Sequence, residues 1–359
     1  MSEAYGMDKI VDATGVPAPD MNYRPPMPKR YRPKIGLVGC GGITAYHLEA
    51  YRVLGLEVAA FCDKDLAKAT ERRDTYNPDG QVYTDYRELL KDDAIEVIDA
   101  ATYPDPRVAI LEASIEAGKH VLSQKPFVED LDLGRRICDA ADARGVKLAV
   151  NQNGRWAPHF AWMNAAIHAG SIGEVSSIDF NLQWDHTWTA GTPFEDIHHL
   201  VLYDFGIHWF DITNALLDGQ EPSAIHATVG RTGFQQMKPP FLAQVMMDFE
   251  DTQVRMSFNA HVVHGQEDRT IVCGEKGTLR AWGPELNRQQ VGLWTEAGFA
   301  QPELAGCWFE SGFQGTMGEL LCAIEENRQP SNSARGNLKS LAMCFQAMEA
   351  AGKGGSPGP

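Results

Sequence analysis

Short apolar runs alternate with stretches of helical periodicity from Lys34 to Asn153, and this alternation limits the possible folds more than any other feature of the chain. The expected strands are Ile35–Val38, Val58–Cys62, Val97–Ala101, His120–Leu122 and Leu148–Asn151. Strands that alternate with helices form βαβ units, in which helices cover both faces of a parallel sheet. Residues 34–153 are therefore predicted to form a doubly wound α/β domain of the Rossmann type.

The period of the hydrophobic pattern changes after residue 170. In VSSIDFNLQW, apolar residues from Ile178 to Trp184 alternate with polar ones, which is typical of a strand with one solvated face. Further strands are expected at Ala224–Val229, Ala243–Phe249, Val254–His261, Thr270–Val272 and Thr278–Ala281. The joins FEDTQ and GEKGT have the pattern of hairpin turns, so residues 154–350 are predicted to form an α+β domain with an open, mainly antiparallel sheet. Helical stretches at Gly315–Glu325 and Ser333–Glu349 close it, and the last helix is a candidate to pack back on the first domain.

The two ends of the chain lack the periodic hydrophobic pattern of the two predicted domains. Residues 1–33 contain six prolines and little periodicity, which predicts an extended arm that lies on the surface or reaches a neighbouring subunit. Residues 351–359, rich in glycine and proline, are expected to form a flexible tail.

Composition argues against several classes of partner. The chain carries 32 basic and 48 acidic residues, and the resulting net charge of −16 disfavours nucleic acid and anionic membranes. No window approaches about eighteen consecutive apolar residues and no signal-peptide pattern is present, so a cytoplasmic protein is expected. The 7 cysteines are odd in number, scattered and never spaced as C-x-x-C, which argues against a disulfide framework or a zinc ribbon.

The segment KIGLVGCGGITAYHLEAY predicts a nucleotide-binding turn. A strand that ends at Val38 leads through Gly39, Gly41 and Gly42 into a helix from Thr44. Gly39 permits the tight turn, Gly41 lacks a Cβ where the backbone approaches a ligand, and the free N–H groups of the helix N-terminus attract a pyrophosphate. Taken alone, the pattern also occurs in plain loops and in methyltransferases.

An acidic residue follows the second expected strand. Asp63 ends VAAFCD, where a carboxylate can accept hydrogen bonds from both hydroxyls of an adenosine ribose. It would repel a 2′-phosphate, although Lys64 beside it softens that repulsion, so NAD is favoured over NADP. The alternative is that Asp63 only caps the helix expected near Leu66.

The segment SQKPFVEDLD places Lys125 at the end of an apolar strand. In a doubly wound sheet this is the rim where ligands bind, and Pro126 disfavours a helical conformation at Lys125. An ammonium there can donate to a substrate hydroxyl and stabilise the alkoxide that forms as hydride departs. The alternative is an ordinary strand-end lysine whose ammonium lies in water.

A third group of polar residues lies in EDIHHLVLYDFGIHWFDITNALLDG. Asp204, His208 and Asp211 are spaced i, i+4 and i+7, which places them on one stripe of a helix. Histidine has a pKa suited to removing a hydroxyl proton, and Asp204 could orient the imidazole or hold a second substrate hydroxyl. The alternative for His208 is a satisfied histidine of the core.

The same segment is crowded with possible metal ligands. The crowded residues are Asp196, His198, His199, Asp204 and His208. Their spacing does not follow H-E-x-x-H or a comparable zinc framework, so no metal is expected.

These motifs occur in an order that resembles a known family, the glucose–fructose oxidoreductase, inositol dehydrogenase and MocA family of nicotinamide-dependent dehydrogenases. The resemblance runs from about Ile35 to Glu349 and rests on GLVGCGGI with Asp63, AGKHVLSQKP, YDFGIHWFD, VCGEKGTL and AIEENRQPSNS. It implies that Lys125 lies near the nicotinamide and that His208 is the proton acceptor. Gln124 stands where the family has a glutamate that approaches the cofactor ribose.

The motifs and the resemblance together give the expected site. The expected cofactor positions are Gly39, Gly41, Gly42, Ile43, Asp63, Lys64, Tyr103, Pro104, Gln124, Lys125, Asn153 and Arg155. The expected substrate positions are Lys125, Trp156, Trp184, His199, Asp204 and His208, with His186, Trp188, Glu195 and His198 near them. Aromatic and histidine side chains suit a polyhydroxylated ring.

We therefore expect an NAD-dependent oxidoreductase that binds a sugar, polyol or cyclitol between its domains. His208 and Asp204 would handle the hydroxyl proton while Lys125 stabilises the alkoxide. The alternatives are a non-catalytic redox sensor that binds NAD, a methyltransferase, and a metal-dependent isomerase or hydrolase. The resemblance also implies a homodimer or homotetramer formed through the open sheet.

Overall fold

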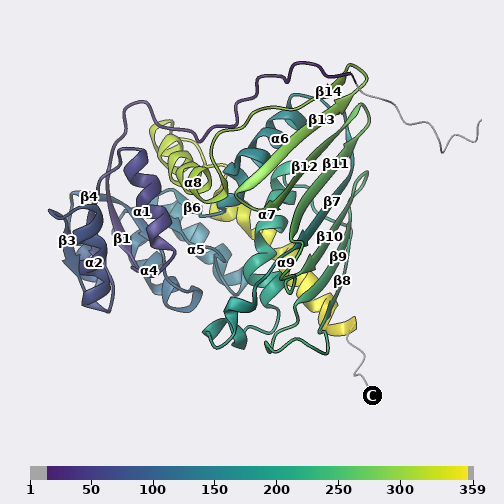
Figure 1. Cartoon of the computed structure of the whole chain (residues 1–359). Coiled ribbons are helices and arrows are strands. Elements are labelled where there is room, and N and C mark those ends of the chain that lie inside the picture. Colours follow the sequence, from purple (N-terminus) through teal and green to yellow (C-terminus); the bar gives the residue numbers. More distant parts are fainter. Residues whose placement is uncertain (1–13, 355–359) are drawn as a thin grey trace, which may run out of the picture.

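Two sheets with helices between them organise the chain (Figure 1). The computed structural model describes residues 14–354. The first sheet forms one half of the molecule, and the second, larger sheet stands at the opposite side with its outer face uncovered (Figure 1). The expected arm and tail lie partly outside the described residues, at 1–13 and 355–359. Within residues 14–354, no helix is long and apolar enough to cross a membrane.

The first sheet is parallel throughout and has the strand order β3-β2-β1-β4-β5-β6. Its strands are β1 Lys34–Val38, β2 Val58–Cys62, β3 Gln81–Tyr83, β4 Ile95–Ala100, β5 His120–Ser123 and β6 Leu148–Val150. Its helices are α1 Thr44–Val53, α2 Leu66–Tyr76, α3 Tyr86–Leu89, α4 Pro104–Glu116 and α5 Leu131–Arg144. The doubly wound prediction is confirmed, and the strand order reverses between β1 and β4, which is where such sheets bind ligands.

The second sheet has the order β14-β13-β12-β11-β7-β10-β9-β8. Its strands are β7 Val175–Gln183, β8 Ala224–Gly230, β9 Leu242–Asp248, β10 Gln253–Asn259, β11 Glu267–Gly274, β12 Gly277–Glu285, β13 Arg288–Thr295 and β14 Gly298–Ala300. Only the β7–β10 pair is parallel, so the prediction of a mainly antiparallel sheet is confirmed. The helices that follow the first sheet are α6 Pro158–His168, α7 Ile207–Leu216, α8 Trp308–Glu325 and α9 Ala334–Gly354.

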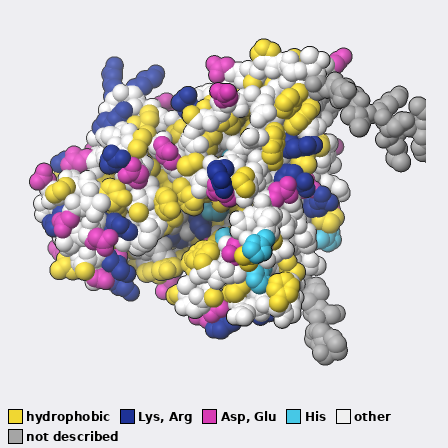
Figure 2. Space-filling view, viewed as in Figure 1, with side chains coloured by type: hydrophobic (Ala, Val, Ile, Leu, Met, Phe, Trp, Pro, Cys, Tyr) yellow, Lys and Arg dark blue, Asp and Glu magenta, His cyan; other side chains and the backbone are white. Residues whose placement is uncertain are grey.

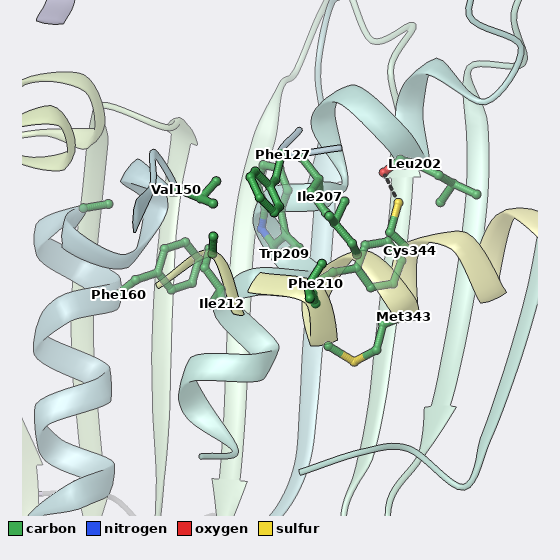
Figure 3. Packing of buried hydrophobic residues seen from close by; sticks show 14 of the residues in the cluster. Phe127, Val150, Phe160, Leu202, Ile207, Trp209, Phe210, Ile212, Met343 and Cys344 are labelled. Carbon is green, nitrogen blue, oxygen red and sulfur yellow. Dashed lines mark hydrogen bonds between the residues drawn. The ribbon is translucent and has the colours of Figure 1, made fainter. Parts of the chain in front are cut away.

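A continuous core joins the two halves. Ile178, Phe180 and Leu182 on the inner face of β7 are at most 1% exposed, as their alternation predicts. Figure 3 shows side chains of α7 and α9 packed with Phe127 and Val150 of the first half, and the thiol of Cys344 donates to a backbone carbonyl 3.3 Å away. Burial of each large apolar side chain stabilises the fold by about 1.5–3 kcal/mol.

The two C-terminal helices return to the first half of the molecule. Helix α8 packs along α1, and its residues Phe313, Met317 and Leu320 join the core on that side of the Rossmann sheet. Helix α9 contacts α5, where Arg335 pairs with Asp139 and with a second aspartate of α5.

The described part of the arm lies on the surface of its own chain (Figure 1). Val16 N–H donates to the carbonyl of Phe299 at 2.8 Å, and this contact adds the arm to the edge of the second sheet. Further along, the carboxylate of Glu325 accepts three consecutive backbone N–H groups, from residues 29–31. Residues 14–33 therefore follow the first of the two predicted courses, along the surface.

Candidate active site

The glycine turn leaves open space above the first sheet. Gly39 has φ +94°, and a Cβ on it would lie 2.7 Å from the carbonyl oxygen of Ala101. At Gly41 and Gly42 a Cβ would meet no atom within 4 Å. The turn is held by Thr44, whose hydroxyl donates to the Gly41 carbonyl at 2.6 Å. A cradle of this form, at the N-terminus of α1, suits a pyrophosphate.

Asp63, which follows β2, is hydrogen-bonded to the backbone of the glycine turn. Its carboxylate accepts the N–H of Cys40 at 2.8 Å and that of Asp65 at 2.9 Å, one on each oxygen. The cap of α2 is Asp65, which accepts the N–H of Ala67 at 3.0 Å, so the alternative that Asp63 caps this helix is wrong. Each oxygen of Asp63 keeps a lone pair for a further donor, and Lys64 beside it is exposed.

Other expected cofactor positions lie at the same rim. Ile43, at the entry to α1, is 36% exposed. Tyr103 is 68% exposed and directly precedes α4, which begins at Pro104. Asn153 begins a 3₁₀ turn after β6 and is buried.

Several buried polar atoms at this rim are without a hydrogen-bond partner among residues 14–354. They are Thr102 Oγ1, Asn151 Oδ1 and both polar atoms of the Gln152 side chain. Buried polar groups normally have partners, and the hydroxyls and amide of a dinucleotide would supply them. The residues present therefore fit a dinucleotide across this rim.

Lys125 bridges the two halves of the molecule. Its Nζ lies 2.7 Å from the backbone oxygen of Asp204 and 3.1 Å from Asp204 Oδ1. The two side chains are 18% and 15% exposed. The alternative of an ammonium in open water is therefore wrong. The peptide bond between Lys125 and Pro126 is cis.

The segment that carries Asp204 is not a regular α-helix. Residues Val201–Phe205 form a π-helical turn, and Gly206 N–H donates to the Val201 carbonyl at 2.7 Å before α7 begins. This extra residue changes the helical phase between Asp204 and the residues that follow. Turns of this kind are frequent at functional sites.

The prediction that Asp204, His208 and Asp211 share one stripe of a helix is therefore wrong for Asp211. Asp211 does not share a face with Asp204; it accepts from Arg155 Nε and from the hydroxyl of Ser340 at 2.9 Å. Arg155 also donates to the Ser331 carbonyl at 2.9 Å, so its guanidinium holds the chain together at this point.

His208 packs on Trp308 and lies within range of the Lys125 charge. Burial lowers the pKa of His208 well below the usual range of histidine, and the positive charge of Lys125 lowers that pKa further. The ring meets Trp308 edge-on at 5.4 Å, and Nδ1 has no partner among the described residues. With Nδ1 unpaired within residues 14–354, His208 is not a satisfied core histidine.

Aromatic side chains and histidines line the second half of this region. His186 stacks on Phe205 at 3.8 Å, and its Nδ1 accepts from Trp188 Nε1 at 3.2 Å. Burial lowers the pKa of His186 to about 4, although the charges of Asp185 and Asp204 oppose that shift. Trp184 is 7% exposed and packs on Trp209. Figure 2 shows a hollow between the two halves, with basic and histidine side chains beside it.

Of the other expected substrate residues, Trp156 lies apart from this group. Trp156 packs against Gly315 and lines, with Asn214 and Lys339, a cavity whose lining includes neither Lys125 nor His208. His199 contacts His198 edge-on at 4.6 Å, and burial lowers its pKa.

The crowded segment 196–208 does not gather its side chains into one cluster. Asp196 lies 3.4 Å from Lys238, whereas Asp204 faces Lys125. Within residues 14–354, no group of three or more histidines, cysteines and carboxylates could hold a metal ion.

Sequence reasoning missed a buried polar cluster under Lys125. His47 and Asp99 are 0% exposed and 2.7 Å apart, and Gln124 Nε2 lies 3.1 Å from the His47 ring. The signal in the sequence was Asp99 itself, a carboxylate inside the apolar strand IEVIDA, because such a group needs buried partners.

Both halves of the chain match known families. Residues 33–152 match a model described as an oxidoreductase family with an NAD-binding Rossmann fold, and residues 160–280 match the GFO/IDH/MocA C-terminal domain. Together these matches span more than half of the chain.

Two curated relatives and one solved structure are similar to this chain over most of their length. D-apiose dehydrogenase of Paraburkholderia graminis is 25% identical over 86% of this chain and 85% of that protein. Inositol 2-dehydrogenase of Rhizobium meliloti is 24% identical over 88% of this chain and 96% of that protein. An oxidoreductase from Agrobacterium radiobacter, solved with NAD⁺, L-tartaric acid and magnesium, has a TM-score of 0.82 at 21% identity and covers 90% of this chain and 98% of that one.

Proposed function

Because the chain belongs to the GFO/IDH/MocA family of oxidoreductases, with an NAD-binding Rossmann domain, we propose that it transfers hydride between NAD and a CH–OH carbon of a sugar, polyol or cyclitol. The observation that carries the proposal is the Lys125–Asp204 ion pair, which crosses between the two halves and whose lysine charge acts on His208. Lys125 lies at the edge of the first sheet formed by the carboxyl ends of its strands, and the glycine turn lies at the same edge.

The cofactor is held by the first half of the molecule. Gly41 and Gly42 leave room for the pyrophosphate, and Asp63 accepts the adenosine ribose hydroxyls with the lone pairs that its two N–H contacts leave free. A carboxylate at this place repels a 2′-phosphate, which supports NAD over NADP. The bound dinucleotide supplies a hydride acceptor. Titration of NADH and NADPH by fluorescence tests this preference, and tighter NADPH binding would overturn it.

Lys125 and His208 divide the work on the substrate hydroxyl. The Lys125 ammonium, held by Asp204, donates to the substrate oxygen and stabilises negative charge as it develops there. The neutral imidazole of His208 takes the hydroxyl proton, a role that typically contributes about 10²- to 10⁴-fold to the rate. Asp204 keeps the ammonium in place and can accept from a second hydroxyl. In the reverse direction the same groups return the proton.

The proposed substrate class is supported by the aromatic side chains around Phe205. His186, Trp188 and Phe205 present aromatic faces and a neutral ring nitrogen, a combination that suits a ring with apolar faces and several hydroxyls. The relatives named as apiose and inositol dehydrogenases support the same class. A screen of NAD reduction over aldoses, cyclitols and sugar acids tests the proposal. NADH binding without turnover of any of them would favour a non-catalytic NAD-binding redox sensor.

We also infer that copies of the chain assemble through the uncovered face of the second sheet. The helices α6, α7 and α9 cover only its inner face (Figure 1), and Met246 on β9 is 51% exposed. Light scattering of the purified protein tests this, and a monomer at micromolar concentration would refute it.

A further inference from the structure

Five polar side chains form a buried cluster below Lys125. They come from α1, from β4 and from the ends of β5 and β6, and each is at most 8% exposed: His47, Tyr51, Asp99, Gln124 and Asn151. The cluster therefore ties the dinucleotide-binding helix to the strands whose ends form the rim of the site.

Asp99 and the His47 ring form the centre of the cluster. One oxygen of Asp99 lies 2.7 Å from His47 Nδ1 and accepts the hydroxyl of Tyr51 at 2.7 Å. The other ring nitrogen, His47 Nε2, lies 3.1 Å from Gln124 Nε2 and 3.1 Å from Asn151 Nδ2. Gln124 Oε1 accepts the backbone N–H of Lys125 at 2.7 Å.

These contacts fix the direction of every hydrogen bond from Lys125 to Asp99. A backbone N–H can only donate, so the Gln124 atom that faces Lys125 must be the amide oxygen. The amide nitrogen of Gln124 then faces His47, and an amide nitrogen also only donates. His47 Nε2 must therefore accept, which leaves the single ring proton on Nδ1, donated to Asp99.

We propose that Gln124 is a positioning residue, which links the backbone of Lys125 to the ring of His47 and so fixes where the Lys125 ammonium stands opposite Asp204. This role rests on the proposed function of Lys125. It is a different role from the contact with the cofactor ribose that the family resemblance implies, since the two polar atoms of the Gln124 side chain face His47 and the Lys125 N–H.

The chemistry of the cluster also explains why an amide is needed at this position. A glutamate at 124 could still accept the Lys125 N–H, but it would offer no donor to His47 Nε2. The contact could form only if His47 gained a second proton, so that an imidazolium stood between two carboxylates. Gln124→Glu would then bind one proton more than the natural chain. The groups that face His47 are Asp99 and Tyr51 as titratable residues, the amides of residues 124 and 151, and the ring of Phe313 at 4.5 Å.

The first test does not depend on activity. ¹⁵N NMR of the His47 ring in the full chain should show a protonated Nδ1 and a bare Nε2 from about pH 5 to about pH 8, the range in which histidines usually titrate. The Gln124→Glu variant should show both ring nitrogens protonated at the lower end of this range. A natural chain with a proton on Nε2, or with a doubly protonated ring, would overturn the proposal even if the proposed dehydrogenase activity is established.

The second test separates positioning from cofactor contact. Gln124→Met should lower kcat about ten- to hundredfold, because displacement of a catalytic group by about 1 Å can cost this much, and should leave NADH affinity within about twofold. Gln124→Glu should recover kcat relative to Gln124→Met as the pH is lowered. Gln220→Met, at an exposed position after α7, is the matched control and should change neither quantity. A loss of NADH affinity with kcat retained would show that Gln124 contacts the cofactor, and it would overturn the proposal.

Discussion

Lys125→Met tests the catalytic group directly, because it removes the ammonium while keeping most of the length of the side chain. In the structure that ammonium has two partners on Asp204, at 2.7 and 3.1 Å, and is 18% exposed. Removal of one preorganised donor from a developing oxyanion typically costs about 10²- to 10³-fold in kcat, or about 3–4 kcal/mol. We therefore expect kcat for NAD reduction to fall by about that factor, with NADH affinity within about threefold of the natural chain.

The same substitution has a stability consequence that can be measured separately. It leaves the Asp204 carboxylate, 15% exposed, without its cation. Removal of one partner from a fully buried pair costs about 3–5 kcal/mol, and the remaining exposure of Asp204 reduces the expected loss to about 1–3 kcal/mol. Urea unfolding followed by fluorescence measures this loss. Lys91→Met, which removes an exposed partner of Glu88, is the control and should change stability by less than about 0.5 kcal/mol.

A Lys125→Met variant that keeps the kcat of the natural chain would show that Lys125 does not stabilise the alkoxide. A loss of NADH affinity as large as the loss of kcat would also contradict it, because Lys125 would then serve cofactor binding and not the alkoxide.

Three further predictions use other parts of the structure. His208→Gln should lower kcat by about 10²- to 10⁴-fold. In the natural chain, kcat/KM should decline on the acidic side only below pH 6.5, because burial lowers the pKa of His208. A decline that begins above pH 6.5 would refute the assignment of His208 as the proton acceptor. Asp63→Asn should weaken NADH binding about tenfold and reduce the difference in affinity between NADH and NADPH, both measured by fluorescence titration. An unchanged ratio of the two affinities would show that Asp63 does not select the cofactor. Burial raises the pKa of Asp268 from the usual 3.8 to about 7, so the folded state keeps a proton that the unfolded chain loses. The stability of the fold should therefore decrease as the pH rises from about 4 to about 7. Asp268→Asn should remove this loss of stability with pH and raise the free energy of unfolding at neutral pH by about 2–4 kcal/mol. Equal unfolding curves of the natural chain at pH 4 and pH 7 would contradict the prediction.

Much of the fold could be predicted because its strands carry a clear period. The buried parallel strands are continuous apolar runs, and β7 alternates strictly. The strands β3, β13 and β14 were missed for physical reasons: β3 has three residues with none buried, and β13 places polar residues and Gly292 in a pattern without a clear period. Their pairing depends on neighbouring strands and not on local sequence.

The site was predictable where position in the fold decides it. Lys125 could be placed because a strand end of a doubly wound sheet has a fixed position, and its pairing with Asp204 agrees with that placement. The role of His208 was implied by the family resemblance. Asp211 was placed wrongly because a constant helical period was assumed, and the π-helical turn at Val201–Phe205 leaves no mark in the hydrophobic pattern. The partners of Asp63 depend on backbone N–H groups, which sequence does not identify. The His47 cluster was missed because a single histidine on a helix resembles any core residue.

A double-mutant cycle of kcat/KM between Lys125→Met and His208→Gln tests most directly whether the two side chains act in one pocket on one transition state. If they do, the double variant should be only slightly slower than the slower single variant, with a coupling energy above about 1 kcal/mol. Rate losses that multiply in the double variant would show that the two residues act independently, and that result would contradict the central claim.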